Sequence, residues 1–415
     1  MSMRFRACRV CEDCSRGSEL REVRSRQAAL VEAGMPSKLA KKQRGSALSD
    51  TDELLEATTA LILPLLHALD ALNQAGRLMH PPALQEVVAA IAPYRDPLEE
   101  GRQVFTQAQW PDHLEAFTLH ANMATTLALR AFDGFTSAMD QAEPPMAAYR
   151  AMGLATQAYA AAYPLAAMLP PVNRFYLESD VREDEELQRK LMEADPEKPN
   201  VGVMHADNAS DQRAGFSVYV PEYYQGETLP LVVALHGGSG HGRQFLWSWL
   251  RAVRSDPCIL IAPTSTDRTW SLMNPEADSQ RLHGLVAYAK EHWNVDTQRI
   301  LLTGMSDGGT FSYVSGLQAD SPFTHLAPCS ASFHPMLMEV VDPTRVQGLP
   351  IYLMHGALDW MFPVSVAQEA NIAISAAGAK VLYREIENLS HTYPQEENPS
   401  ILRWLAGDVQ PAHEH

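Results

Sequence analysis

The sequence predicts an α/β domain with a mostly parallel sheet and helices on both faces, preceded by an all-α helical domain. Two observations predict this architecture. After about residue 212, short unbroken apolar segments alternate with helical segments, as in buried parallel strands joined by helices. Between about 50 and 170, apolar residues recur at three- and four-residue spacing among many alanines, as in closely packed helices.

The overall composition limits the classes of function. The chain has 415 residues with 46% hydrophobic residues, which is enough apolar material for two domains. Its net charge of −17 argues against nucleic-acid binding, because a phosphate backbone attracts basic surfaces. The apolar segment 60–66 contains Pro64, so we expect a buried, kinked helix and no membrane span. With no secretory signal recognised, a cytoplasmic location is expected.

Residues 1–48 are predicted to be a disordered basic leader. The first 46 residues hold eleven Lys and Arg against five Asp and Glu and show no apolar periodicity. Cys8, Cys11 and Cys14 have a spacing that suggests metal ligands, but a structural site usually needs four ligands, and no further Cys or His lies near them in sequence. We therefore expect no metal site, and five cysteines in the whole chain are too few for a disulfide framework.

Residues 49–198 are predicted to be a helical bundle and a charged linker. A first helix begins after the Ser49 and Asp50 start signal and ends at Gly76. Three further helical patterns cover 82–93, 111–141 and 144–169, and the charged segment 178–198 is predicted to be a solvated helix or linker. This domain could be a lid over the site, a homodimer interface or a surface-docking module, and the sequence does not distinguish these roles.

Residues 199–415 are predicted to form the sheet domain. Its chemistry is expected at the carboxyl ends of the strands. The predicted strands cover 215–224, 229–237, 258–265, 299–306, 324–332, 350–359 and 380–388. The predicted helices cover 242–255, 279–293, 308–318, 364–378 and 398–407.

Ser306 is the predicted nucleophile. It lies in Gly304-x-Ser306-x-Gly308, on a sharp turn between the strand "RILLTG" and the helix "GGTFSYVSGLQ". Glycine two residues before and after the serine prevents collisions with neighbouring backbone. The alternative, a glycine-rich turn without chemistry, is disfavoured by the other motifs that follow the same order along the chain.

An oxyanion hole is predicted at the end of an earlier strand. The segment "LVVALHGG" ends in Gly237 and Gly238, and acyl transfer needs two preorganised donors for the developing oxyanion. We expect these donors to be the backbone N–H groups of Gly238 and Asp307, with Gly237 as the second choice for the first donor. His236 in this segment is expected to stabilise the turn.

Asp359 and His391 are the predicted acid and base. Asp359 follows the strand "IYLMHG", and His391 lies in the loop after the next strand, "LYREIEN". The base must reach the serine with one ring nitrogen and the acid with the other. The competing interpretation of Asp359 is an ordinary turn aspartate. The competing base is His334, which precedes Asp359 in the chain.

With these motifs, residues 212–407 resemble an α/β-hydrolase. The order Ser306, Asp359, His391 is that of the fold. The segments "LHGG", "GMSDGG" and "HGALDWMFPV" resemble the phospholipase/carboxylesterase group of serine esterases, which includes polyester depolymerase-like members. The resemblance implies a carboxylic ester hydrolase that works without a cofactor or metal. Asp307 departs from the Gln or Ala often found in that group.

The predicted substrate is a neutral ester of short or medium acyl chain, or a polyester. Trp360, Trp270 and Phe362 are candidate walls of an apolar pocket near the strand ends, and the carboxylate of Asp307 would disfavour anionic substrates. Two alternatives remain open from sequence. One is a serine peptidase or amidase of the same fold, and the other is a helical adaptor or surface-binding protein that carries a hydrolase domain.

Overall fold

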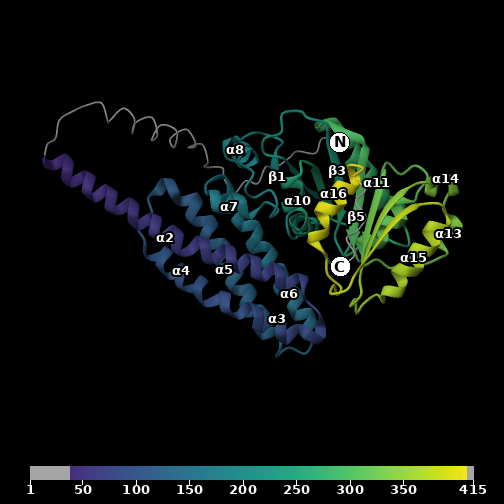
Figure 1. Ribbon diagram of the computed structural model, residues 1–415, viewed down its shortest axis with the longest axis horizontal. Helices are drawn as coiled ribbons and strands as arrows, with labels where there is room; N and C mark the ends of the chain where they lie inside the picture. The colour runs from purple at the N-terminus through teal and green to yellow at the C-terminus, as the bar shows by residue number, and fades with distance from the viewer. Residues whose placement is uncertain (1–37, 409–415) are drawn as a thin grey trace.

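The computed structural model describes residues 38–408, and helices of the N-terminal part pack beside a sheet domain (Figure 1). The N-terminal helices are α2 (Lys38–Arg77), α3 (Leu84–Ile91), α4 (Arg95–Gln107), α5 (Glu115–Ala138), α6 (Pro144–Ala162), α7 (Pro170–Phe175) and α8 (Glu185–Glu193). Short 3-10 turns lie at Pro81–Ala83, Ala92–Tyr94, Asp112–Leu114 and Tyr163–Ala167. The three cysteines of the predicted leader lie outside the described residues.

Helices α2 and α4 differ from the sequence prediction, and the short helix α7 is an addition to it. Helix α2 begins at Lys38, inside the predicted disordered leader, and continues through Pro64 to Arg77. Helix α4 was not predicted, because its segment is polar and carries few apolar residues. Its Leu98 and Phe105 are nevertheless fully buried in the bundle.

The segment Thr51–Arg77 of α2 is long and apolar enough, by length and composition, to cross a membrane. In this structure one face of the segment packs within the protein, while Leu55 and Leu63 are exposed. Leu61, Leu65 and Leu72 are almost completely buried among the other helices. Core helices of folded domains have the same composition, so the absence of a membrane span stays a prediction.

The sheet has eight strands in the order β1-β2-β4-β3-β5-β6-β7-β8. Strands β3 to β8 run parallel, whereas the edge strand β1 is antiparallel to β2 and β2 is antiparallel to β4. The strands are β1 (Gly202–Ala206), β2 (Phe216–Val220), β3 (Leu229–Leu235), β4 (Ile259–Pro263), β5 (Val295–Met305), β6 (His325–Cys329), β7 (Pro350–Gly356) and β8 (Lys380–Ile386). The predicted mostly parallel sheet is confirmed, and β1 is an additional strand that the sequence analysis did not identify.

Helices cover both faces of this sheet, as predicted. They are α9 (Gly242–Phe245), α10 (Leu250–Ser255), α11 (Glu276–His292), α12 (Asp307–Gly316), α13 (Leu337–Val340), α14 (Pro343–Val346), α15 (Val364–Ala376) and α16 (Asn398–Leu405). Strands β2, β3 and β4 are almost continuously apolar because side chains on both of their faces are buried.

The helical part and the sheet domain share one hydrophobic core. Residues of one sheet face, such as Val232 and Leu260, belong to the same buried cluster as Leu65 of α2 and Phe132 of α5. The opposite sheet face forms a second cluster with α11, α12 and α15. A fragment that begins near residue 200 would therefore expose apolar surface of the first cluster.

A buried ionic cluster reinforces this junction. Arg254 of α10 is 2% exposed and pairs with Glu222, which lies after β2, at 2.8 Å. Arg254 also donates to the backbone and side-chain oxygens of Asn173 in α7. Glu222 accepts further hydrogen bonds from Tyr163 and Tyr219, both at 2.7 Å. The charged groups of this cluster are thus paired with partners, as burial requires.

Candidate active site

Ser306 lies on the turn between β5 and α12, at the carboxyl end of the parallel sheet. Its backbone has φ 55° and ψ −121°, a positive-φ conformation that is strained for a residue with a side chain. The turn is held by a hydrogen bond from the Ser306 N–H to the Cys329 carbonyl and by one from the Thr310 N–H to the Ser306 carbonyl. Both bonds keep the hydroxyl at the N-terminus of α12.

The glycines of the Gly304-x-Ser306-x-Gly308 motif are required by close backbone contacts. A Cβ atom on Gly304 would lie 2.5 Å from the backbone of Gly308. A Cβ atom on Gly308 would lie 2.5 Å from the carbonyl oxygens of Leu235 and His236 at the end of β3. The motif therefore brings β5, α12 and the end of β3 into direct backbone contact.

The structure brings Ser306, His391 and Asp359 together. The Nε2 atom of His391 lies 3.0 Å from the Ser306 Oγ atom, and its Nδ1 atom lies 2.8 Å from an Asp359 carboxylate oxygen. The three residues come from turns after β5, β8 and β7, so three strand ends at the same edge of the parallel sheet supply one cluster, although β6 lies between β5 and β7. His334, the competing base, is exposed and its Nδ1 atom accepts from the Met336 N–H.

Asp359 is held as a carboxylate. Burial favours its protonated form, but hydrogen bonding to His391 and to the backbone N–H groups of Phe362 and Met361 outweighs burial and lowers its pKa. Asp359 is 8% exposed. It can therefore accept from the Nδ1–H of His391, which leaves Nε2 free to accept the hydroxyl proton of Ser306.

His355, also near Asp359, has a different environment. It is fully buried at the end of β7, and its Nε2 atom lies 2.9 Å from the Phe362 carbonyl and 3.5 Å from the Asp359 carboxylate. Burial lowers its pKa, so the ring is neutral and donates to the Phe362 carbonyl. His355 thus supports the turn that carries Asp359.

The predicted oxyanion donors flank Ser306. The ends of β3 and β5 pair side by side through Leu235 and Gly304, which brings the Gly237–Gly238 turn next to Ser306. A Cβ atom on Gly237 would lie 3.4 Å from the Cβ atom of Ser306. Within the described chain, no hydrogen bond occupies the Gly238 N–H. The Asp307 N–H lies in the first turn of α12, where N–H groups have no intrahelical partner.

The Asp307 carboxylate lies beside this turn. One of its oxygens accepts from the Thr269 hydroxyl at 2.5 Å and lies 2.7 Å from the position of a Cβ atom on Gly238. The acidic side chain therefore borders the predicted oxyanion hole. Thr269 was not identified from sequence, because it lies in an irregular loop without a motif.

Trp270 is a correction to the predicted substrate wall. It is 1% exposed, its indole N–H donates to the His236 carbonyl at 2.8 Å, and its ring stacks on Phe311. It therefore holds the His236 turn against α12. His236 stabilises the same region through its Nε2 atom, which accepts from the Ser265 N–H, and burial lowers its pKa to about 4.

Trp360 and Phe362, by contrast, lie close to the reacting groups. Trp360 follows Asp359 directly and is 42% exposed. The Phe362 ring lies 5.4 Å from the His391 ring, in an edge-on arrangement. Both aromatic side chains are therefore available at the edge of the site.

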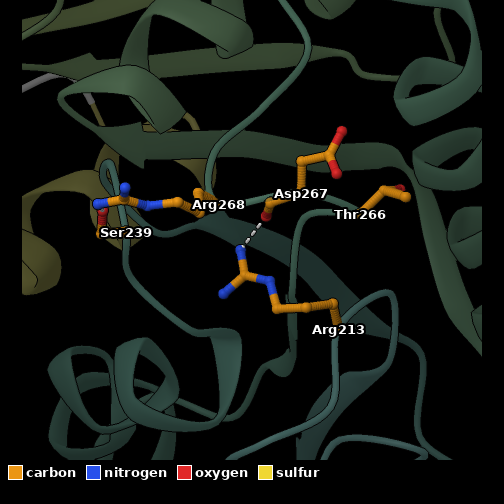
Figure 2. A pocket seen from close by; sticks show the side chains of 5 residues that line it. All are labelled: Arg213, Ser239, Thr266, Asp267 and Arg268. Carbon is orange, nitrogen blue, oxygen red and sulfur yellow. Dashed lines mark hydrogen bonds between the residues drawn. The ribbon is translucent and has the colours of Figure 1, made fainter.

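A polar pocket of about 280 Å³ flanks the Gly238 turn and is lined by Arg213, Ser239, Thr266, Asp267 and Arg268 (Figure 2). Arg213 donates to the carbonyls of Gly240 and Asp267 and to the Ser265 hydroxyl. Arg268 donates to the Ser239 hydroxyl at 3.0 Å. These arginines brace the loop that carries the predicted oxyanion donor.

The site shows no sign of a metal centre. Between residues 38 and 408, no group of three or more His, Cys, Asp or Glu side chains is arranged to hold a metal ion. The cysteines of this part, Cys258 and Cys329, are buried free thiols, and burial raises the pKa of each well above its ordinary value.

The fold and the site together define an α/β-hydrolase domain that follows a helical region. Residues 231–407 match the family model described as Phospholipase/Carboxylesterase. The resemblance inferred from sequence is therefore confirmed for this segment.

Individual relatives cover only parts of the chain. A bifunctional acetylxylan esterase/xylanase from Neocallimastix patriciarum is 28% identical over 160 residues, which are 37% of this chain and 23% of that protein. A thermostable esterase is 22% identical with a TM-score of 0.40, over 48% of this chain and 61% of that one. The SOBER1 structure from Arabidopsis thaliana is 15% identical with a TM-score of 0.37, over 44% of this chain and all of that one. The chain thus spans under a quarter of the curated relative.

Proposed function

We propose that this protein is a serine carboxylesterase that uses Ser306 as nucleophile, His391 as general base and Asp359 as the orienting acid. The single observation that carries the proposal is the continuous hydrogen-bonded series from Asp359 through His391 to Ser306, with distances of 2.8 and 3.0 Å. The match of residues 231–407 to an esterase family supports it. The positive φ of Ser306 supports it too, because such strain is typical of nucleophile turns.

The proposed reaction has two halves. His391 Nε2 takes the hydroxyl proton of Ser306 as Oγ attacks the ester carbonyl carbon, and the N–H groups of Gly238 and Asp307 bind the resulting oxyanion. The intermediate collapses, His391 passes the proton to the departing alcohol, and an acyl-enzyme remains. His391 then takes a proton from water, which attacks the acyl carbon. The acid is released, and the proton returns to Ser306.

We infer that the substrate is a neutral ester with a short or medium acyl chain, including polyester-type esters. Trp360 and Phe362 offer apolar surface next to His391. The Asp307 carboxylate beside Gly238 disfavours a negatively charged acyl group. Neither a cofactor nor a metal ion is part of this proposal.

An acetylated polysaccharide is the second candidate substrate. Trp360 is 42% exposed beside the site and offers a flat ring against which a sugar can pack. A relative that is 28% identical over 160 residues carries acetylxylan esterase in its name. Acetate release from acetylated xylan would favour this candidate, whereas preference for longer p-nitrophenyl esters would favour the first.

The test combines a fluorophosphonate probe with p-nitrophenyl esters of graded acyl length. We expect the full chain to be labelled at Ser306 and to hydrolyse the esters, and Ser306→Ala to lose both reactions while it stays folded. Ester turnover near the wild-type rate in Ser306→Ala would overturn the proposal. Amide substrates with the same acyl groups test the peptidase alternative, which rapid amide hydrolysis would favour. A binding partner retained by Ser306→Ala would support the adaptor alternative.

A further inference from the structure

The loop that carries His391 is buried, which is unusual for a connecting segment. Residues 389–394 are all buried, and His391 is 4% exposed. A buried loop must find hydrogen-bond partners for its backbone groups. The sheet domain supplies some of them, since the Leu358 N–H donates to the Leu389 carbonyl and the Ser390 hydroxyl to the Leu358 carbonyl.

The helical part holds the same loop from the opposite side. Arg77, the last residue of α2, donates to the backbone carbonyl and side-chain oxygen of Asn388 at 3.1 and 2.8 Å. The Arg77 carbonyl accepts from the Thr392 hydroxyl at 3.2 Å. The Nδ1 atom of His80 lies 3.1 Å from the Ser390 hydroxyl. Residues before 81 therefore contact a loop that begins after 386.

Tyr149 of α6 makes the contact closest to the reacting groups. Its hydroxyl donates to the backbone carbonyl of His391 itself, at 2.8 Å. Burial raises the pKa of the phenol to about 12, and Trp360 and Asp359 are close enough to shift that pKa in opposite directions. The hydroxyl therefore remains protonated and can donate. Tyr149 thus contacts the backbone of the proposed base directly.

Loss of this donor would leave the His391 carbonyl buried without its partner. Such a carbonyl is costly to bury, so the loop would shift until water or another donor reaches it. His391 Nε2 must stay within hydrogen-bond reach of Ser306 Oγ, and a misplacement of about 1 Å in a reacting group costs roughly 10²-fold in rate. The backbone of the proposed base is therefore held by a side chain of the helical part.

We propose that Tyr149 is a positioning residue that the helical part contributes to the active site. It fixes the backbone of His391 so that the imidazole stays aligned between Asp359 and Ser306. This inference rests on the proposed serine esterase function. It makes the helical part a component of the catalytic apparatus, in addition to any role as a lid or an interface.

The experiment compares Tyr149→Phe with Tyr163→Phe in the full chain. Each variant removes one phenolic hydroxyl of the helical part, but Tyr163 donates to Glu222 and, among the described residues, makes no hydrogen bond to the His391 loop. We expect Tyr149→Phe to lower kcat and the rate of fluorophosphonate labelling by about tenfold, because loss of one hydrogen bond should misplace His391 by less than about 1 Å, a displacement that costs roughly 10²-fold. The KM should stay within twofold of wild type. We expect Tyr163→Phe to keep kcat within twofold of wild type. Its thermal unfolding midpoint should fall at least as far as that of Tyr149→Phe.

Three outcomes would overturn the assignment. The first is a kcat for Tyr149→Phe within twofold of wild type. The second is an equal kcat loss in Tyr163→Phe, which would attribute the effect to the junction as a whole. The third is a rise in KM without a fall in kcat, which would make Tyr149 a substrate contact. If Tyr149→Phe does not fold, Arg77→Met tests the same loop, and an unchanged kcat in that variant overturns the assignment.

The same series separates this inference from the proposed function. If the wild-type chain neither reacts with the probe nor hydrolyses any ester, the proposed function fails and this inference fails with it. If the wild-type chain is active and Ser306→Ala is inactive, the proposed function stands. An unchanged Tyr149→Phe variant then overturns the positioning role alone.

Discussion

Arg254 of α10 and Glu222, which follows β2, form an ion pair of 2.8 Å, and Arg254 is 2% exposed. The same arginine donates to Asn173 of α7, and Tyr163 of the helical part donates to Glu222. Burial alone would raise the pKa of Glu222, but the charge of Arg254 and the hydrogen bonds of its neighbours hold that pKa below its ordinary value. This pair joins the two halves of the molecule.

Glu222→Gln is expected to destabilise the whole protein. Removal of one charge from a buried pair leaves its partner uncompensated, which costs roughly 3–5 kcal/mol in free energy of unfolding. Chemical denaturation with a structural probe measures the change. Asp133→Asn is the control, because the Arg95–Asp133 pair is exposed and worth below about 1 kcal/mol. Equal effects of the two variants would contradict the role given to the buried pair.

Two carboxylates predict that the free energy of unfolding decreases at acidic pH. Glu222 and Asp359 both have pKa values held below their ordinary 4.5 and 3.8, so the unfolded chain binds more protons than the folded one as the pH falls through this range. Their contribution is fully present above the ordinary values and is lost as the pH falls through the folded pKa values. Denaturation curves between pH 6 and about pH 3 measure this decline.

The variant Glu222→Gln measures how much Glu222 contributes to this pH dependence of the free energy of unfolding. Tyr163, Tyr219 and Arg254 face its carboxylate, so Glu222→Gln removes one titrating group from a defined cluster. The decline of unfolding free energy with acidification should become shallower in this variant. A slope identical to that of wild type would show that Glu222 does not carry the acid sensitivity.

The backbone strain at Ser306 predicts that Ser306→Gly is more stable than Ser306→Ala, which is the opposite of the order expected inside a helix. Ser306 has φ 55°, which glycine adopts without the penalty of about 1–3 kcal/mol that a side chain brings. Ser306→Gly should therefore unfold at a higher denaturant concentration than Ser306→Ala, although both lose ester hydrolysis. At Ser312, inside α12, the order should reverse, because glycine is about 1 kcal/mol worse than alanine in a helix.

Asp359→Asn is expected to lower kcat by about 10⁴-fold while the fold is retained. The amide oxygen can keep the hydrogen bonds from the Met361 and Phe362 N–H groups, which hold the turn. It cannot stabilise the imidazolium of His391 or enforce its tautomer. Steady-state hydrolysis of a p-nitrophenyl ester measures the loss. Asp342→Asn is the control, since Asp342 only caps the start of α14 and should not affect kcat.

Most of the sheet domain could be predicted from sequence because its signals are local. The unbroken apolar segments of β3 and β4 require burial on both faces, and the predicted strands match the observed ones closely. Strand β5 begins at Val295, before its predicted start at 299, because its first half is polar. The motif around Ser306 is also readable, since the glycines that it needs are two residues away. The parallel order of β5, β6, β7 and β8 then brings the turns of Ser306, Asp359 and His391 to one edge.

Other elements have weak or no local signals. Helix α4 was missed because its polar segment buries only a few residues, among them Leu98 and Phe105. Strand β1 was missed because it is a short edge strand with partial burial. Trp270 was assigned to the substrate wall because an aromatic residue near a strand end looks the same in sequence whether it is buried or exposed.

The sequence by itself therefore determined the class of fold, the order of the predicted triad and the turns that carry it, because each depends on residues close together in the chain. Only the tertiary structure decided that Trp270 is buried, that Trp360 is exposed and that Tyr149 donates to the carbonyl of His391. Tyr149 and His391 are 242 residues apart, and no local pattern encodes their contact. A pattern of apolar residues reports which face of an element is buried, whereas the partner of that face depends on how both domains pack.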